Sequence, residues 1–178
     1  HNKISRGKEL LARLSAGENI AVVSDAGMPG ISDPGADLIK LAVENNIEVS
    51  VLPGACAGIT ALVASALPTD KFVFEGFIGT DNKRINLFTD MIKKELRTVI
   101  IYEAPHRIVK TLTLLCSHIP QRRIAVCREL TKIHEDIFRG TVAEALAHFE
   151  NNVPKGEFVI VIKGASEEDV THICEMSD

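Results

Sequence analysis

Apolar and polar residues follow one another along the chain in blocks that predict alternating helices and strands. Helical spacing places Leu10, Leu11 and Leu14 on one side of residues 5–16. The continuously apolar run at 20–23 is typical of a strand buried in a parallel sheet, and the run IEVSVL at 47–52 predicts a second strand. A helix at 34–46 separates these runs, and a helix of small residues follows at 55–67. This rhythm predicts an α/β layered domain.

The second half of the chain repeats the alternation after a polar break at residues 68–72, which we interpret as a linker. Apolar patterns predict strands at 72–78, 98–105, 123–130 and 156–164, and helices at 85–96, 106–119 and 142–151. Residues 132–141 are expected to form an extended arm. The fold class is therefore α/β with two α/β domains, at residues 1–69 and 70–164, followed by a tail at 165–178.

The first apolar run leads into the loop SDAGMPGISDPG, which concentrates Gly27, Gly30 and Gly35. Glycine loses much backbone freedom on folding, so this density indicates that something approaches the backbone closely. The spacing matches neither the dinucleotide fingerprint nor the phosphate-binding loop. Asp25 and Asp33 favour a ligand that carries a cation or hydroxyl groups. A plain turn, with Ser32 or Asp33 capping a helix that begins at Pro34, explains only the end of the loop.

Charge and cysteine content narrow the classes of partner. The net charge of −4 divides unevenly, because residues 97–139 carry eight basic and four acidic side chains whereas residues 140–178 carry two and eight. The basic segment favours an RNA partner, although solvated helix faces explain it equally simply. Four scattered cysteines predict free thiols and no zinc site. The lack of a signal sequence or membrane span predicts a cytoplasmic protein.

Several longer motifs carry a specific resemblance: VVSDAGMPGISDPG, LPGACAGITALVASALPTDKFVFEGF, YEAPHR, RELTKIHE and RGT. In order and spacing they resemble the tetrapyrrole methylase superfamily over residues 2–164. They are most similar to the branch that methylates a cytidine ribose 2′-hydroxyl in the decoding region of 16S rRNA. The resemblance implies S-adenosylmethionine in a cleft between two domains, a 30S ribosomal subunit as partner, a homodimer and no metal. It also implies a preceding strand and proline–glycine loop, so that the first domain is incomplete at its amino terminus.

The same resemblance assigns residues to the cofactor. One group belongs to the glycine loop, one to the following helix, and the third is the chain's single tyrosine. The cofactor residues implied are Asp25, Gly27, Met28, Pro29, Gly30, Ile31, Ser32, Ala57, Thr60, Ala61 and Tyr102. Close helix–sheet packing is the alternative for the small residues, and a half-buried core position is the alternative for Tyr102.

Catalytic and RNA-binding candidates come from YEAPHR and RELTKIHE. The first motif follows a predicted strand, at the carboxyl end where open α/β sheets place their sites. A ribose hydroxyl is a weak acid, so a base or a nearby cation is expected. The catalytic candidates are Glu103, His106, Glu129 and Lys132, and helix capping is the alternative for His106. The candidates for RNA phosphates are Arg107, Lys110, Arg128 and Arg139.

Three functions remain open from the sequence. The first is an S-adenosylmethionine-dependent methyltransferase of an rRNA ribose. The second is a methylase of a corrin or porphyrin precursor, whose glycine loop typically contains GDP where this chain has SDAG. The third is a catalytically incomplete fragment that only binds RNA or a protein partner.

Overall fold

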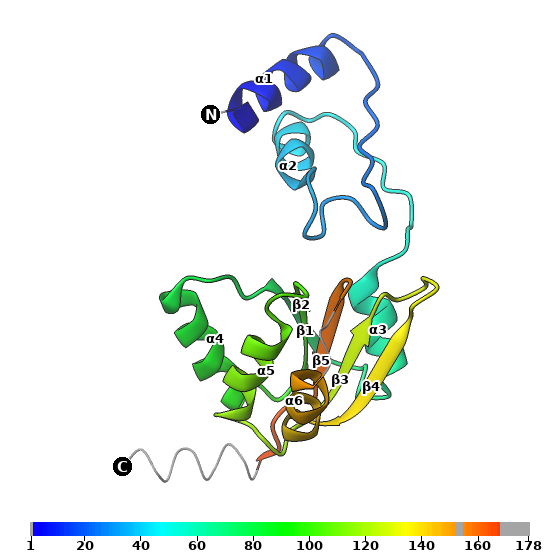
Figure 1. Ribbon diagram of the computed structural model, residues 1–178. Helices are drawn as coiled ribbons and strands as arrows, with labels where there is room; N and C mark the ends of the chain where they lie inside the picture. The colour runs from blue at the N-terminus through cyan, green and yellow to red at the C-terminus, as the bar shows by residue number, and fades with distance from the viewer. Residues whose placement is uncertain (1, 152–154, 168–178) are drawn as a thin grey trace. The chain divides into compact units, whose positions relative to one another are not determined.

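The computed structural model describes residues 2–151 and 155–167 and divides into two compact units, His1–Cys56 and Ala57–Asp178 (Figure 1). The expected tail therefore lies mostly outside the described residues. Each unit is described by itself below. The division precedes helix α3 (Ala57–Ser65), whereas the sequence places a linker after it, because Ala61 and Leu62 pack into the core of the second unit.

The first unit contains two helices in its described part, α1 (Asn2–Ser15) and α2 (Ala36–Glu44). They pack closely, since a Cβ on Gly7 would lie 3.1 Å from Leu41 Cδ1. The strands predicted at 20–23 and 47–52 are wrong, because neither run forms a ladder with a neighbour among the described residues. Without such a neighbour, Val23 and Leu52 remain 83% and 84% exposed.

Helix α2 begins two residues later than the sequence predicts. Its N-cap is Gly35, with φ 127°, and no side chain caps it by a hydrogen bond. That φ lies outside the helical region, so Pro34 is not the first helical residue and neither Ser32 nor Asp33 is the cap. Gly35 is also tightly packed, because a Cβ there would lie 2.9 Å from Val22 Cγ1.

The second unit is built on a mixed sheet. Its strands are β1 (Phe72–Phe77), β2 (Thr98–Glu103), β3 (Arg123–Arg128), β4 (Asp136–Thr141) and β5 (Phe158–Ile162). Among the described residues they are ordered β1-β2-β5-β3-β4. β1 and β2 are parallel, and the other pairs are antiparallel. The predicted extended arm thus forms β4 and pairs with β3.

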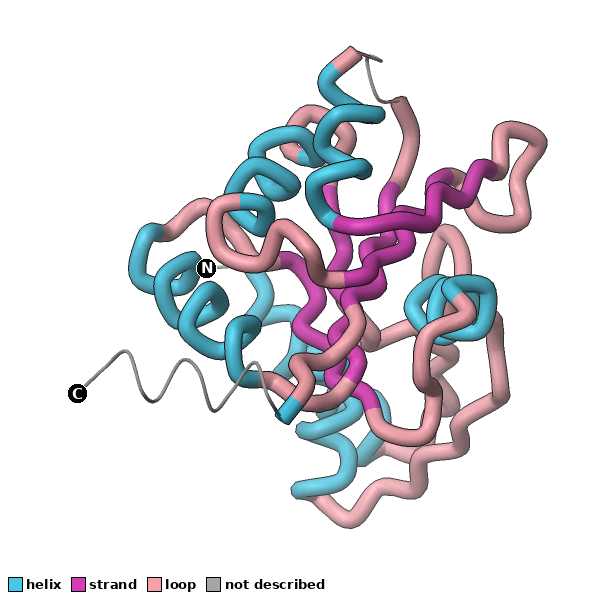
Figure 2. The backbone as a smooth tube through the Cα atoms, turned by 90° about the horizontal axis from the view of Figure 1, so that it is seen from below, coloured by secondary structure: helices cyan, strands magenta, loops and turns pink. Residues whose placement is uncertain are grey.

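Helices cover both faces of this sheet. α4 (Asn82–Lys94), α5 (Ile108–Cys116) and α6 (Val142–Glu150) supply the larger core cluster on one face, and α3 supplies the smaller cluster on the other. Figure 2 shows the strands between these helices. The strand and helix predictions for this half of the chain are confirmed with shorter ends, except that α4 begins at Asn82, three residues earlier than predicted. Among the described helices, none has both the length and the apolar character needed to cross a bilayer.

The RGT motif starts α6. Thr141 is the N-cap: its hydroxyl accepts from Glu144 N–H at 3.2 Å, and the Glu144 carboxylate accepts from Thr141 N–H at 2.7 Å. This reciprocal capping box satisfies two amide groups at the helix start. Gly140 leaves room for it, because a Cβ there would lie 2.7 Å from Glu144 Oε2.

Candidate functional site

The glycine loop of the first unit bends repeatedly through left-handed backbone conformations. Gly27 and Gly30 have φ of 85° and 81°, and Ser32 has φ of 57°. Ser24 Oγ donates a hydrogen bond to the carbonyl of Gly27 at 3.0 Å, which closes the first bend. Glycine is required where a side chain would be strained at positive φ, so the loop shape explains two of the glycines that the sequence singled out.

The segment at residues 53–56, which follows the run at 47–52, meets this bend within the same unit. A Cβ on Gly27 would lie 2.9 Å from the carbonyl oxygen of Ala55, and one on Gly54 would lie 3.9 Å from Met28 Cα. A side chain at position 27 would therefore collide with backbone. The structure thus brings together the glycine loop and a second loop that lies almost thirty residues further along the chain.

Side-chain exposure differs around the loop. Asp25, Ile31 and Ser32 are exposed, whereas Met28, Pro29 and Gly30 are half-buried. An open, largely apolar hollow lies between the second half of the loop and α2. Its lining residues are Pro29, Gly30, Ile31, Ala36, Ile39, Lys40, Val43 and Glu44. The Asp25 carboxylate is not part of this hollow, so the loop offers an apolar surface and a separate exposed charge.

Helix α3 carries the next predicted residues. Ala57 is exposed and Thr60 is half-buried, but Ala61 is fully buried in the smaller core cluster. The Ala61 methyl group therefore serves helix–sheet packing. Gly58 packs just as closely, since a Cβ there would lie 3.4 Å from Tyr102 Oη. The Gly58 N–H donates to that hydroxyl at 3.0 Å.

The YEAPHR segment ends β2 and turns into α5. Glu103 is buried, and its carboxylate accepts from Thr111 Oγ1 at 2.5 Å and from Ala104 N–H at 2.9 Å. The Arg107 Nε lies 3.6 Å from Glu103 Oε1, and its guanidinium also donates to the carbonyl of Gly79. This arrangement compensates a buried charge with an ion pair and hydrogen bonds.

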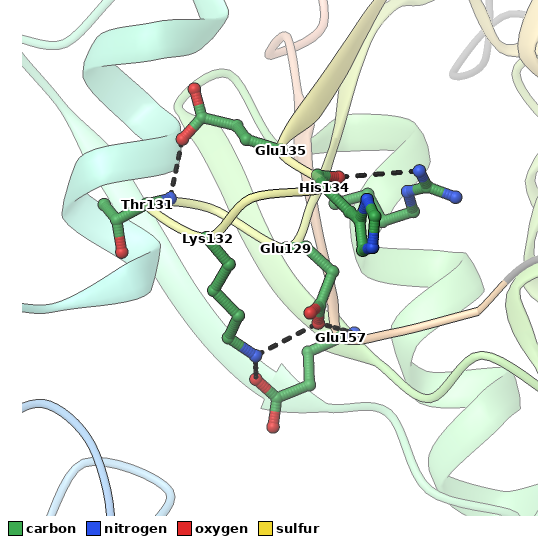
Figure 3. Close-up of polar contacts among 7 residues, drawn as sticks. Glu129, Thr131, Lys132, His134, Glu135 and Glu157 are labelled. Carbon is green, nitrogen blue, oxygen red and sulfur yellow. Dashed lines mark hydrogen bonds and ion pairs between the residues drawn. The ribbon is translucent and has the colours of Figure 1, made fainter.

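RELTKIHE forms the connection between β3 and β4, where Glu129 and Thr131 have φ of 47° and 65° (Figure 3). Lys132 Nζ lies 3.0 Å from Glu129 Oε1 and 2.9 Å from Glu157 Oε2. The Glu129 carboxylate also accepts from Glu157 N–H at 2.8 Å, and Glu135 accepts from Thr131 N–H at 2.6 Å. These contacts attach the loop to the residue that precedes β5.

The same contacts fix the charge states within this cluster. Hydrogen bonds from Glu157 N–H and then from Lys132 hold the pKa of Glu129 below its usual value. Hydrogen bonds to Glu157 and then to Glu129 raise the pKa of Lys132. Near neutral pH, Glu129 is therefore ionised and Lys132 is protonated, so neither is a ready proton acceptor.

The remaining candidates are dispersed over the second unit. His106 and Lys110 are exposed, at the turn after β2 and on α5. Arg139 Nε donates to the carbonyl of Ala64 at 3.0 Å. Arg128 contacts the carbonyl of His134 at 3.5 Å, while its Nε is buried without a hydrogen-bond partner among the described residues.

Three partners of these candidates were missed by the sequence analysis: Thr111, Gly79 and Glu157. They lie 8, 28 and 25 residues from Glu103, Arg107 and Lys132 respectively. Only the position of Thr111 could have been inferred from the sequence, because it lies one helical turn beyond Arg107 in the predicted helix. The other two contacts depend on how separate elements pack.

Metal-ligating side chains do not cluster in the described part of the chain, where no group of three or more His, Cys, Asp or Glu residues is placed to hold an ion. Cys127 is buried, and desolvation raises the pKa of its thiol to about 11. A thiol of this kind is a poor nucleophile near neutral pH. The arrangement therefore offers backbone loops, carboxylates and basic groups for its chemistry.

Two curated relatives share most of this chain. A Synechocystis protein named ribosomal RNA small subunit methyltransferase I is 54% identical over 170 residues, which cover 95% of this chain and 61% of the relative. A Bacillus subtilis protein of the same name is 42% identical over 170 residues, covering 96% of this chain and 58% of the relative. The chain thus spans about three fifths of the length of these relatives.

Solved structures share the fold at lower identity. The methyltransferase CobJ matches with a TM-score of 0.66 and 19% identity, covering 93% of this chain and 72% of that chain. Uroporphyrin-III C-methyltransferase from Thermus thermophilus, complexed with S-adenyl homocysteine, matches with a TM-score of 0.57 and 17% identity, covering 96% and 75%. Residues 2–146 match the family described as Tetrapyrrole (Corrin/Porphyrin) Methylases. Together with the 54% identity to a curated relative, this match shows that the chain belongs to the tetrapyrrole (corrin/porphyrin) methylase family.

Proposed function

We propose that this protein transfers a methyl group from S-adenosylmethionine to the ribose 2′-hydroxyl of a cytidine in 16S rRNA. The observation that carries the proposal is the 54% identity, over 95% of the chain, to a relative named ribosomal RNA small subunit methyltransferase I. The choice of cytidine and of its 2′-hydroxyl rests on the motifs of the sequence. A 30S subunit as partner, a homodimer and a cytoplasmic location belong to the same proposal.

The glycine loop fits the methyl donor in shape and charge. The close packing of Gly27 against the Ala55 carbonyl fixes the bend, and the glycines of the loop leave little side-chain bulk around its main-chain groups. Asp25 places an exposed carboxylate beside this bend, which suits the sulfonium cation and the ribose hydroxyls of S-adenosylmethionine. The structural neighbour complexed with S-adenyl homocysteine supports a ligand of this type. Met28, Pro29, Gly30, Ile31 and Ser32 complete the proposed contacts in this unit.

The donor supplies an electrophilic methyl group, and the protein must align the accepting hydroxyl with it. Such alignment accounts for several kcal/mol of a barrier. Of the four catalytic candidates, Glu103 is occupied by Thr111 and Arg107, and Lys132 is held protonated. His106 is exposed at the turn after β2, so we assign it the role of accepting the hydroxyl proton.

RNA contacts are assigned to basic groups that have donors to offer. Lys110 is exposed on α5. Arg128 has a buried Nε–H without an acceptor among the described residues, and leaving such a group unpaired costs about 1–3 kcal/mol. Because this Nε is buried, the RNA contact of Arg128 is assigned to its terminal guanidinium nitrogens. Arg107 and Arg139 also donate to backbone carbonyls, so we expect them to contribute less to RNA affinity.

Mass spectrometry of 16S rRNA nucleosides tests the proposal. Deleting the gene in its own organism should remove one 2′-O-methylcytidine, and the wild-type gene should restore it. A His106→Ala gene should restore little of the modification, whereas a His118→Ala gene, which changes an exposed histidine beyond α5, should restore it fully. Unchanged ribose methylation after deletion would refute the assignment. Methyl transfer by the purified protein to uroporphyrinogen rather than to 30S subunits would instead support the corrin or porphyrin alternative.

A further inference from the structure

Helix α3 is fixed at both ends by side chains from the sheet. At its start, the N–H of Gly58 donates to the hydroxyl of Tyr102 in β2, 44 residues away. At its end, the carbonyl of Ala64 accepts from the guanidinium of Arg139 in β4, 75 residues away. Helix ends expose unpaired N–H and C=O groups, so both contacts satisfy groups that the helix cannot satisfy itself.

The tyrosine side of this arrangement has little freedom. The Tyr102 ring packs edge-on against Phe74 and Phe77, with centroid distances of 5.0 and 5.7 Å. Gly58 lies against the same surface, since a Cβ there would lie 3.4 Å from Tyr102 Oη and 3.5 Å from Ile100 Cγ2. The position of the ring therefore sets the position of the first turn of α3.

The arginine side connects α3 with β4. Arg139 lies in β4, paired with Ala125 of β3 in the sheet register. Its guanidinium reaches across to Ala64, the last residue but one of α3. The helix is thus held along its axis between two strands, while Ala61 and Leu62 hold its inner face against the sheet.

We infer that Tyr102 and Arg139 are positioning residues for the methyl donor: they hold α3 so that its first turn, with Ala57 and Thr60, is set for the cofactor. This inference rests on the proposed function and on the family resemblance, which assigns Ala57 and Thr60 to the cofactor. It gives Tyr102 and Arg139 a role through α3, in place of direct contact with donor and RNA.

Calorimetric titration of the intact protein with S-adenosylmethionine, in the absence of RNA, tests the inference. Tyr102→Phe removes one hydroxyl and keeps the ring, and Arg139→Gln removes the charged donor at the other end of the helix. Each variant should raise the donor Kd about 3- to 10-fold, the value expected for losing one hydrogen bond. Arg139→Lys, which keeps a charged donor at this end of the helix, should recover part of the affinity.

Thr113→Val is the matched control, because it removes an exposed hydroxyl that donates to the Val109 carbonyl within α5. It should leave the donor Kd unchanged. An unchanged donor Kd in Arg139→Gln would overturn the inference. If only Tyr102→Phe raises the Kd, Tyr102 contacts the donor directly and does not act through α3. Variants that lower Tm but bind the donor like wild type would also overturn it, because the two side chains would then serve only the stability of the fold. Failure of the wild-type protein to bind the donor would refute the proposed function, and this inference with it.

Discussion

Glu103 shows how a single buried charge depends on its neighbours. Its side chain is 1% exposed and is balanced by Thr111, Ala104 N–H and Arg107. Thr111→Val keeps the shape of the side chain but leaves the carboxylate without its 2.5 Å donor. We expect the free energy of unfolding to fall by about 1–3 kcal/mol, because a buried charged acceptor loses a partner. Urea denaturation followed by circular dichroism measures the change.

Thr113→Val provides the comparison on the same helix. Thr113 is exposed and donates to the Val109 carbonyl, so its replacement should change the free energy of unfolding by no more than about 0.5 kcal/mol. Equal losses in the two variants would show that the Glu103 contact adds nothing beyond the general cost of placing valine in this helix. The prediction would then be wrong.

At the scale of elements, the exit of β5 crosses the end of α4 at Gly164. A Cβ on Gly164 would lie 1.9 Å from the carbonyl oxygen of Leu96. The crossing cannot easily open, because Ala165 N–H donates to the Glu95 carbonyl at 2.7 Å and Lys163 N–H donates to the Arg123 carbonyl at 2.9 Å. Gly164→Ala should therefore lower the free energy of unfolding by about 3 kcal/mol or more, measured by urea denaturation.

Lys163→Ala is the control, because it shows whether any substitution in this segment lowers the free energy of unfolding. Lys163 is exposed, and its backbone hydrogen bond does not depend on its side chain. Its replacement should stay within about 0.5 kcal/mol of wild type. A Gly164→Ala protein as stable as Lys163→Ala would mean that the crossing relaxes without cost.

Local pattern predicted the elements of the second unit because their strands pair and pack with other elements of the same unit. Ile100 of β2 and Val161 of β5, for instance, are buried on the face of the sheet that packs against α3, as their apolar runs predicted. The run at 47–52 was also predicted to be a strand but has no ladder among the described residues. Pairing depends on a second strand far along the chain, which periodicity does not report.

The candidate site also combines features that a local sequence pattern reports with contacts that it does not report. Glycine density at the loop agrees with the positive φ of Gly27, because positive φ leaves a signature in residue type. The contacts of Tyr102 with Gly58 and of Lys132 with Glu157 left no such signature. Tyrosine, lysine and glutamate are common at exposed and functional positions alike, so their partners became visible only in the folded chain.

At the scale of the whole molecule, the two units differ in how much of their backbone is held in a sheet. β2 and β5 are paired on both sides within the described residues, whereas residues 20–23 and 47–52 lie outside any ladder. Amide hydrogen exchange should therefore be slowest in β2 and β5 and much faster in those two runs. Mass spectrometry of peptic peptides resolves the difference.

Adding S-adenosylmethionine to the same exchange experiment links this contrast to the proposed function. A ligand that binds the folded form stabilises the regions it contacts, so residues 24–32 and 53–56 of the first unit should exchange more slowly. β2 and β5 should change little, because they are already the most protected. ATP at the same concentration is the control, since its triphosphate meets the exposed carboxylate of Asp25 and should give no protection. Protection by both ligands alike, or protection that leaves residues 24–32 unchanged, would place the donor away from the glycine loop.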